Sequence, residues 1–254
     1  MTAIVGALCQ DGVVIGSDSS VTFGTGSTKT IEQPTEHKIT IVKSNLIMAG
    51  TGAVGLGQRF VHILEDPDTP TIIQKRKPIQ AAVDICKRTV ENFMGTGASK
   101  GAFGALLAFE SGGKYHLCEF AAADFQPELK TVDCWFVSMG SGQPILDPFM
   151  ALLRKIFWRH SQPMVSDGVF AITWALLHAI DVNPGGINAP PRIAVLERSP
   201  DAKQTTARML SEAELLEHVS NVSGVEEYLR AYGDKERVSR DTEISPPPNP
   251  PSPR

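Results

Sequence analysis

The sequence begins with two hydrophobic runs on either side of a turn, Thr2-Ala3-Ile4-Val5-Gly6-Ala7-Leu8 and Val13-Val14-Ile15-Gly16-Ser17-Asp18. Asp11-Gly12 lies between them, and this dipeptide favours a tight hairpin because both positions accept a positive φ. The two runs are therefore predicted to pair as antiparallel strands. Such a hairpin brings the end of the second run back to the start of the first, so Asp18 is expected beside Thr2.

The rest of the chain alternates blocks of strands with pairs of helices. Strands are predicted over 39–42, 46–49, 103–109, 115–120, 134–138 and 192–197. Helices are predicted over 53–65, 78–93, 145–159 and 168–180, and a capping box at Ser211 begins a short last helix. This order predicts an α+β fold rather than regular βαβ alternation. We expect one folded domain over 1–232 and a disordered, charged and proline-rich tail over 233–254.

Composition narrows the class of protein. The chain has 254 residues, 42% of them hydrophobic and 20% charged, and a net charge of −4. No basic face typical of a nucleic-acid binder is visible, the longest apolar run is too short to cross a bilayer, and no signal peptide is recognisable. The cysteines and histidines lack the spacings of a metal site or a disulfide framework. We expect a cytoplasmic protein with no metal, nucleic acid or membrane partner.

One stretch matches a nucleotide-binding pattern. Gly50-Thr51-Gly52-Ala53-Val54-Gly55 is a GxGxxG sequence between a predicted strand and a predicted helix. A dinucleotide site also needs an acidic residue about 20 positions further on, to bind the ribose. Residues 71–76 contain none. The glycines are therefore interpreted as a tight strand-to-helix turn, and no cofactor is expected.

The start of the chain offers a nucleophile. Thr2 follows Met1, and a small second residue favours removal of the methionine. An N-terminal threonine carries a hydroxyl nucleophile and an amine base in one residue, and the pKa of such an amine is about 8. Asp18 and Lys38 could supply an ion pair whose ammonium favours the alkoxide, and the N–H of Gly52 could bind an oxyanion at the start of a helix.

Together these segments resemble the β-type subunits of proteasomes, members of the N-terminal nucleophile (Ntn) hydrolase superfamily. The hairpin and the residues after Asp18 match the start of such a subunit, and His37-Lys38-Ile39 matches the lysine before its third strand. Residues 51–58 match its turn into the first helix. Gly140-Ser141-Gly142 and Asp181, followed by Gly185-Gly186, match later motifs in the same order.

The resemblance implies a four-layer αββα sandwich of two antiparallel sheets flanked by helices, in stacked homo-oligomeric rings of six or seven. It implies an AAA+ ATPase unfoldase as a possible partner, and a bacterial peptidase because a single residue precedes Thr2. It assigns the nucleophile to Thr2, the ion pair to Asp18 and Lys38, and the oxyanion donor to Gly52. Ser141 and Asp181 would bind the amine and its water. Substrate contacts would come from Thr22, along the peptide backbone, and from Val21, Glu36, Gly50 and Val54, around a pocket that Gly50 makes roomy.

Three departures from the family pattern leave alternatives open. The segment between Asp18 and Lys38 is longer than usual, so Lys29 competes for the role of Lys38. Pro184 stands where the family has a serine, and Asn183, Ser141 or water could replace that hydroxyl. Ser20 stands where the family often has an arginine.

The sequence therefore predicts a threonine-type endopeptidase that hydrolyses unfolded proteins inside a self-compartmentalising ring. Two alternatives remain. One is an Ntn hydrolase of a small amide, which the absence of pocket-closing insertions disfavours. The other is a catalytically silent ring or scaffold subunit, which Thr2, Asp18 and Lys38 argue against and Pro184 favours.

Overall fold

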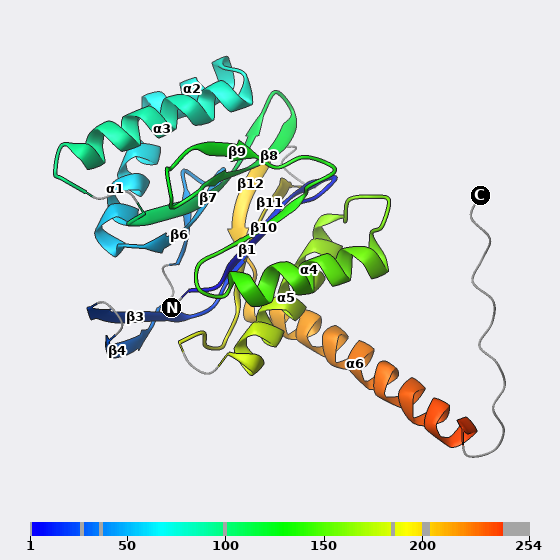
Figure 1. Ribbon diagram of the computed structural model, residues 1–254. Coiled ribbons are helices and arrows are strands. Elements are labelled where there is room, and N and C mark those ends of the chain that lie inside the picture. Colours follow the sequence, from blue (N-terminus) through cyan, green and yellow to red (C-terminus); the bar gives the residue numbers. More distant parts are fainter. Residues whose placement is uncertain are drawn as a thin grey trace.

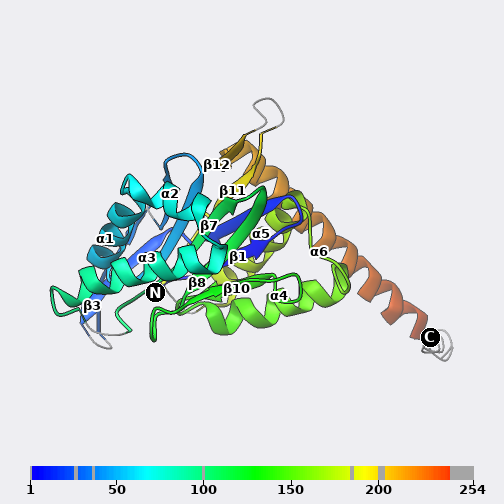
Figure 2. The same cartoon turned by 90° about the horizontal axis from the view of Figure 1, so that it is seen from above.

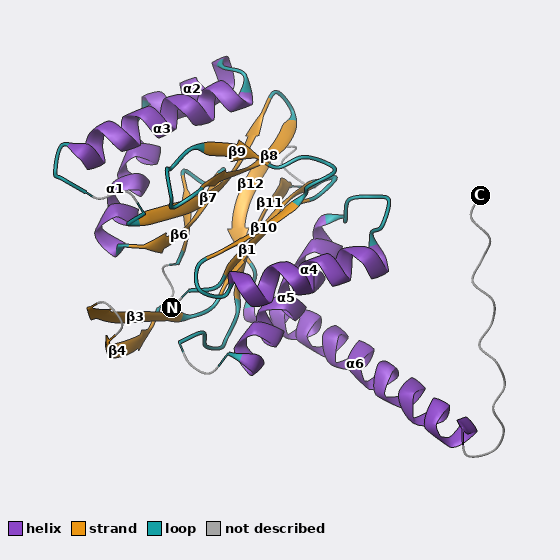
Figure 3. Ribbon diagram, in the orientation of Figure 1, coloured by secondary structure: helices purple, strands orange, loops and turns teal. Residues whose placement is uncertain are grey.

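The protein is a sandwich of two antiparallel sheets between two layers of helices, seen here in a computed structural model (Figures 1 and 3). The structure describes residues 2–25, 28–35, 38–98, 101–183, 186–199 and 204–240. The first sheet has the order β10 (Phe136–Met139), β1 (Ile4–Leu8), β2 (Gly12–Ser17), β11 (Arg192–Arg198), β12 (Thr205–Met209). The second has the order β5 (Ile39–Val42), β6 (Leu46–Gly52), β7 (Phe103–Ser111), β8 (Lys114–Phe120), β9 (Pro127–Leu129).

The helices form the two outer layers, and each layer covers one sheet (Figures 1 and 2). The second sheet is covered by α1 (Val54–Glu65), α2 (Asp68–Lys75) and α3 (Pro78–Met94). The first sheet is covered by α4 (Gln143–Phe157) and α5 (Val165–Val182), and α6 (Glu212–Arg240) packs on α5. The α+β sandwich predicted from the order of elements is therefore confirmed.

The N-terminal hairpin forms as its sequence predicts. Ile4 of β1 lies opposite Ser17 of β2 and Leu8 opposite Val13, so the strands pair in full antiparallel register. The turn closes through the N–H of Cys9, which donates to the carbonyl oxygen of Gly12 at 2.9 Å. The end of β2 consequently lies beside the residue that precedes β1.

Two apolar layers hold the sandwich together. One fills the space between the two sheets and beneath α4 and α5, and the other lies between the second sheet and α1 and α3. The second layer contains a cluster of phenylalanine rings at tilted, stacked and edge-on contacts: Phe60, Phe93, Phe103, Phe120 and Phe125. Each such ring contributes about 2 kcal/mol of burial. α5 is apolar and long enough to span a membrane, but 56% of it is buried in this fold, as is typical of a core helix.

Several elements differ from those expected. The polar stretch after Asp18 forms a two-stranded ribbon of β3 (Ser20–Thr25) and β4 (Thr28–Pro34). α2, β9 and β12 were not predicted. The last helix was expected to be short, yet α6 is 29 residues long and runs to Arg240, past the point where we expected the tail to begin. The proline-rich residues 245–254 lie outside the described residues.

Candidate active site

The main chain of Thr2 is fixed by a loop on one side and by β2 on the other. The N–H of Thr2 donates to Ser141 Oγ at 3.0 Å, and the N–H of Gly142 donates to the carbonyl oxygen of Thr2 at 3.0 Å. The N–H of the next residue, Ala3, donates to Asp18 Oδ1 at 2.8 Å. Thr2 therefore has a defined position at the end of the sheet, and Ser141 contacts its nitrogen as the resemblance implies.

Gly140 provides the space that Thr2 occupies. Its φ is +86°, a conformation that side-chain-bearing residues rarely adopt. A Cβ atom at this position would lie 2.3 Å from the carbonyl oxygen of Thr2 and 3.1 Å from its Cβ atom. The loop at 140–142 can therefore approach Thr2 this closely only with glycine at its first position.

A buried ion pair lies next to the contacts that fix Thr2 and Ala3. Lys38 Nζ is 2.5 Å from Asp18 Oδ1, and the two side chains are 6% and 0% exposed. The other Asp18 oxygen accepts from the N–H and the hydroxyl of Ser20 at 3.2 and 3.3 Å, in the position where the family often has arginine. Asp18 thus links the ammonium to the start of β1. The structure pairs Asp18 with Lys38, while the side chain of the competing Lys29 lies outside the described residues.

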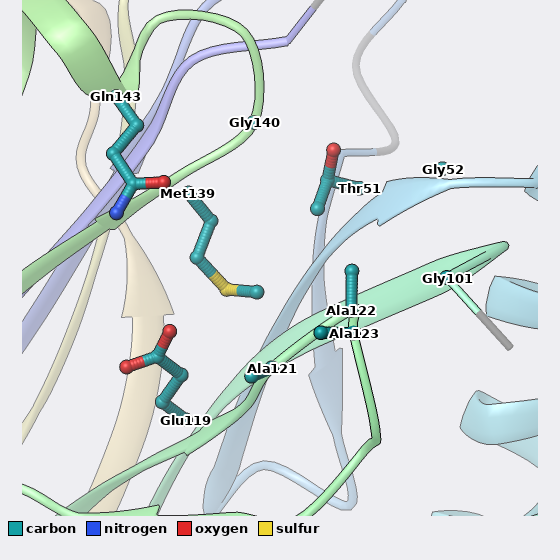
Figure 4. Close-up of a pocket in the computed structure, with 10 residues that line it drawn as sticks. All are labelled: Thr51, Gly52, Gly101, Glu119, Ala121, Ala122, Ala123, Met139, Gly140 and Gln143. Carbon is teal, nitrogen blue, oxygen red and sulfur yellow. The ribbon is translucent and has the colours of Figure 1, made fainter.

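A cavity of about 360 Å³ is lined by Gly140, the residue that lies against Thr2 (Figure 4). Gly140 forms one side of the cavity, and Thr51 and Gly52 at the end of β6 form the opposite side. The chain leaves β6 directly into α1, which begins at Val54. Gly52 and the loop that holds Thr2 therefore face a common space in which a reacting carbonyl can lie.

A family model described as Proteasome subunit matches residues 2–181. The chain belongs to the proteasome subunit family. Its fold is similar to the solved structure of Anbu (ancestral beta-subunit) from Yersinia bercovieri, with a TM-score of 0.62 over 91% of this chain and 97% of that one. The two sequences are 15% identical, so this likeness concerns the fold alone. No protein of curated function matches the sequence.

The expected substrate contacts of this proteasome-family chain come from three elements. Val21 and Thr22 lie on β3, although only the backbone of Thr22 is described. Val54 is 52% exposed at the start of α1. At Gly50, however, a Cβ atom would lie 2.8 Å from the ring of Phe103. The aromatic ring already fills this space, so Gly50 does not itself provide the roomy pocket expected from the sequence.

The late aspartate motif is only partly visible. Asp181 lies in the last turn of α5, is exposed, and makes no hydrogen bond or ion pair to any residue in the part of the chain that the structure describes. Asp181 therefore makes no direct hydrogen bond to the Thr2 nitrogen in this structure, and its expected role at the amine and its water stays a prediction. Pro184 and Gly185 lie outside the described residues, as does Glu36, so the effect of the missing serine remains a prediction.

Some polar residues near Thr2 were not recognised as site residues in the sequence. Within the described ranges, no group of three or more histidine, cysteine or acidic residues could hold a metal ion. The cavity beside Thr2, in contrast, is lined by Glu119, Met139 and Gln143. Gln143 directly follows the Gly-Ser-Gly motif, which could have identified it. No sequence signal marks Glu119, because its place at the site depends on how the two sheets pack.

Proposed function

We propose that the protein is an N-terminal-threonine endopeptidase that hydrolyses unfolded polypeptides in a chamber of stacked homo-oligomeric rings. The observation that supports this proposal is the clamped main chain of Thr2 beside the buried Asp18–Lys38 pair. A structural subunit has no need of a buried lysine whose carboxylate partner also binds the N–H of the residue after Thr2. A cytoplasmic location, expected from the composition, and an AAA+ unfoldase, implied by the family, belong to the same proposal.

In this mechanism, removal of Met1 gives Thr2 a free α-amine. The Thr2 hydroxyl attacks the substrate carbonyl carbon and its proton passes to the amine, while the Lys38 ammonium stabilises the alkoxide. The N–H of Gly52 stabilises the oxyanion of the tetrahedral intermediate. The amine then gives the proton to the departing nitrogen, which leaves an ester on Thr2 that water hydrolyses. Ser141, whose Oγ is 3.0 Å from the Thr2 nitrogen, orients the amine.

The substrate is held as an additional strand in this proposal. An extended peptide would bind between β3 and the end of β6 through its main chain. This mode of binding depends little on substrate sequence. It fits an enzyme whose substrates are unfolded chains rather than one particular small amide.

A mass measurement tests the nucleophile. We expect the purified protein to lack Met1 and to gain one adduct on Thr2 after treatment with a peptide epoxyketone, which requires a hydroxyl and a free amine on one residue. Thr2→Ala should abolish labelling and peptide turnover, whereas Thr71→Ala, a matched change at an exposed position of α2, should alter neither. Turnover that survives Thr2→Ala would refute the mechanism. A chain that keeps Met1 would favour the silent subunit.

A second measurement tests the assembly. The chain mass is 27.4 kDa, so two stacked rings of six or seven copies would weigh about 330 or about 380 kDa. Light scattering during size-exclusion chromatography distinguishes these masses from that of a single subunit. A monomer at all concentrations would contradict the chamber, whatever the result for Thr2.

A further inference from the structure

The cavity beside Thr2 has a chemical character that the catalytic roles above do not use. Glu119 from β8 and Gln143 at the start of α4 point into it from two sides, with the Met139 side chain between them (Figure 4). The remaining walls are small residues, which leave room for a long side chain: Thr51, Gly52, Gly101, Ala121, Ala122, Ala123 and Gly140. Its volume of about 360 Å³ is within the usual range of ligand-binding pockets.

The position of the cavity indicates which part of a substrate it would bind, the part before the cut or the part that departs after it. In the proposed mechanism the Thr2 amine gives a proton to the departing nitrogen, so that nitrogen must lie close to the amine. The Thr2 nitrogen contacts Ser141, and the cavity is lined by the residues at 140 and 143, on either side of Ser141. Val21, Gly50 and Val54, expected around the residue before the cut, do not line it. The cavity is therefore on the side of the residue that follows the cut.

The charge of the cavity wall is negative. Lys130 Nζ lies 2.7 Å from Glu119 Oε2 and 2.7 Å from Glu128 Oε1, so one ammonium is shared by two carboxylates. Burial acts to lower the pKa of Lys130, but the hydrogen bonds to both glutamates outweigh it and raise the pKa, so the lysine stays charged. The three groups together carry one uncompensated negative charge.

Acceptor atoms remain available on this wall. Within the described part of the chain, only Oε2 of Glu119 is engaged, which leaves Oε1 without a hydrogen bond. The amide nitrogen of Gln143 donates to Asp147 Oδ2 at 3.1 Å, so its amide oxygen is the free end of that side chain. A carboxylate oxygen and an amide oxygen are the partners that a guanidinium or ammonium group prefers.

We propose that this cavity binds a positively charged side chain, arginine or lysine, at the position directly after the scissile bond. The stem of that side chain packs on Met139 and the alanines, and its charged head binds Glu119. The inference rests on the proposed peptidase function, since it assigns one substrate position of that site.

Direct binding tests the cavity independently of catalysis. Argininamide is the probe, and its dissociation constant is measured by titration NMR on the full-length protein and on the Thr2→Ala variant, both of which should bind it. Glu119→Gln should weaken binding about tenfold or more, because the contact with the carboxylate is lost. Glu128→Gln is the matched control: it removes the same charge and the same partner of Lys130, but at a side chain that is 66% exposed and does not line the cavity. We expect it to weaken binding about twofold or less.

Cleavage tests the position. Paired quenched fluorescent peptides carry arginine or its neutral analogue citrulline directly after the cut, and kcat/KM should favour arginine about tenfold. The preference should disappear in Glu119→Gln and persist in Glu128→Gln. Equal rates for the two peptides, or equal effects of the two variants, would overturn the inference while leaving the peptidase intact. Glu119-dependent binding of argininamide without cleavage of any peptide would instead contradict the proposed function and leave a cation site.

Discussion

Replacing Lys38 by methionine is expected to destabilise the protein by about 3 kcal/mol. Breaking a buried ion pair costs about 3–5 kcal/mol, because the remaining charge stays out of water without its partner. Asp18 is 0% exposed, but it keeps three donors after the change, from Ala3 N–H at 2.8 Å and from Ser20 N–H and hydroxyl at 3.2 and 3.3 Å. These contacts place the expected cost at the lower end of the range.

Urea unfolding measures this cost. With an m-value of about 3 kcal/mol/M, a loss of about 3 kcal/mol lowers the unfolding midpoint by about 1 M. Protein concentration must be the same for both proteins, because association of subunits also contributes to the apparent stability. Since native proteins have about 5–15 kcal/mol of stability, the variant should still fold, so its epoxyketone labelling can be measured on folded protein and should be lost.

A second substitution tests whether the pair itself carries the effect. The double variant Lys38→Met/Asp18→Asn removes both charges. Its loss of stability should be about 2 kcal/mol smaller than the sum of the losses in the two single variants. Additive losses, or a cost of less than about 1 kcal/mol for Lys38→Met alone, would refute the reasoning. A cost of less than about 1 kcal/mol is typical of an exposed ion pair.

Three further predictions concern other parts of the structure. Gly140→Ala should abolish labelling of Thr2, because the added Cβ atom would meet the Thr2 main chain. Gly97→Ala is the control, since Gly97 also has a positive φ (+70°) but has open space around it, and it should not reduce labelling. Equal losses of labelling in the two variants would show that backbone strain alone matters. A thiol reagent at pH 8 should modify only the exposed Cys134, since the other cysteines are buried and burial raises their pKa values, and Cys134→Ser should remove the fast-reacting thiol. Burial also lowers the pKa of His116 below its usual value of 6.5, so the unfolded chain binds a proton at this residue more readily than the folded protein does. The stability of the folded protein should therefore fall as the pH drops through about 6.5. In thermal unfolding, His116→Phe should reduce this dependence of stability on pH.

The parts of the site that follow local patterns could be predicted from the sequence. A hairpin turn at Asp11-Gly12 is sufficient to bring Asp18 to the start of β1, and the observed register does so. The capping box is equally local: the N–H of Ser211 donates to Glu214 Oε2 at 2.8 Å, and the N–H of Glu214 donates to Ser211 Oγ at 3.3 Å.

The features that were missed depend on contacts between distant segments. Phe103 is far from Gly50 in the sequence, so its ring could not be placed beside that glycine before the pairing of β6 and β7 was known. Glu119 reaches the cavity only because β8 packs against the first sheet. The length of α6 was underestimated for a different reason, since Gly224 and Gly233 weaken a helix and usually indicate its end.

The long α6 helix has a consequence for observing assembly in solution. A helix of 29 residues is about 43 Å long. Its inner part is anchored by Val222, 2% exposed, and by Trp174, whose Nε1 donates to Glu226 at 2.9 Å. Beyond Glu226, Tyr228 and Tyr232 are 72% and 57% exposed. The segment after Glu226 has about the minimum length at which an isolated helix is stable in water. Its amide hydrogens should therefore exchange progressively faster toward Arg240 in an isolated subunit, and any slowing in the oligomer reports that a neighbouring copy covers them.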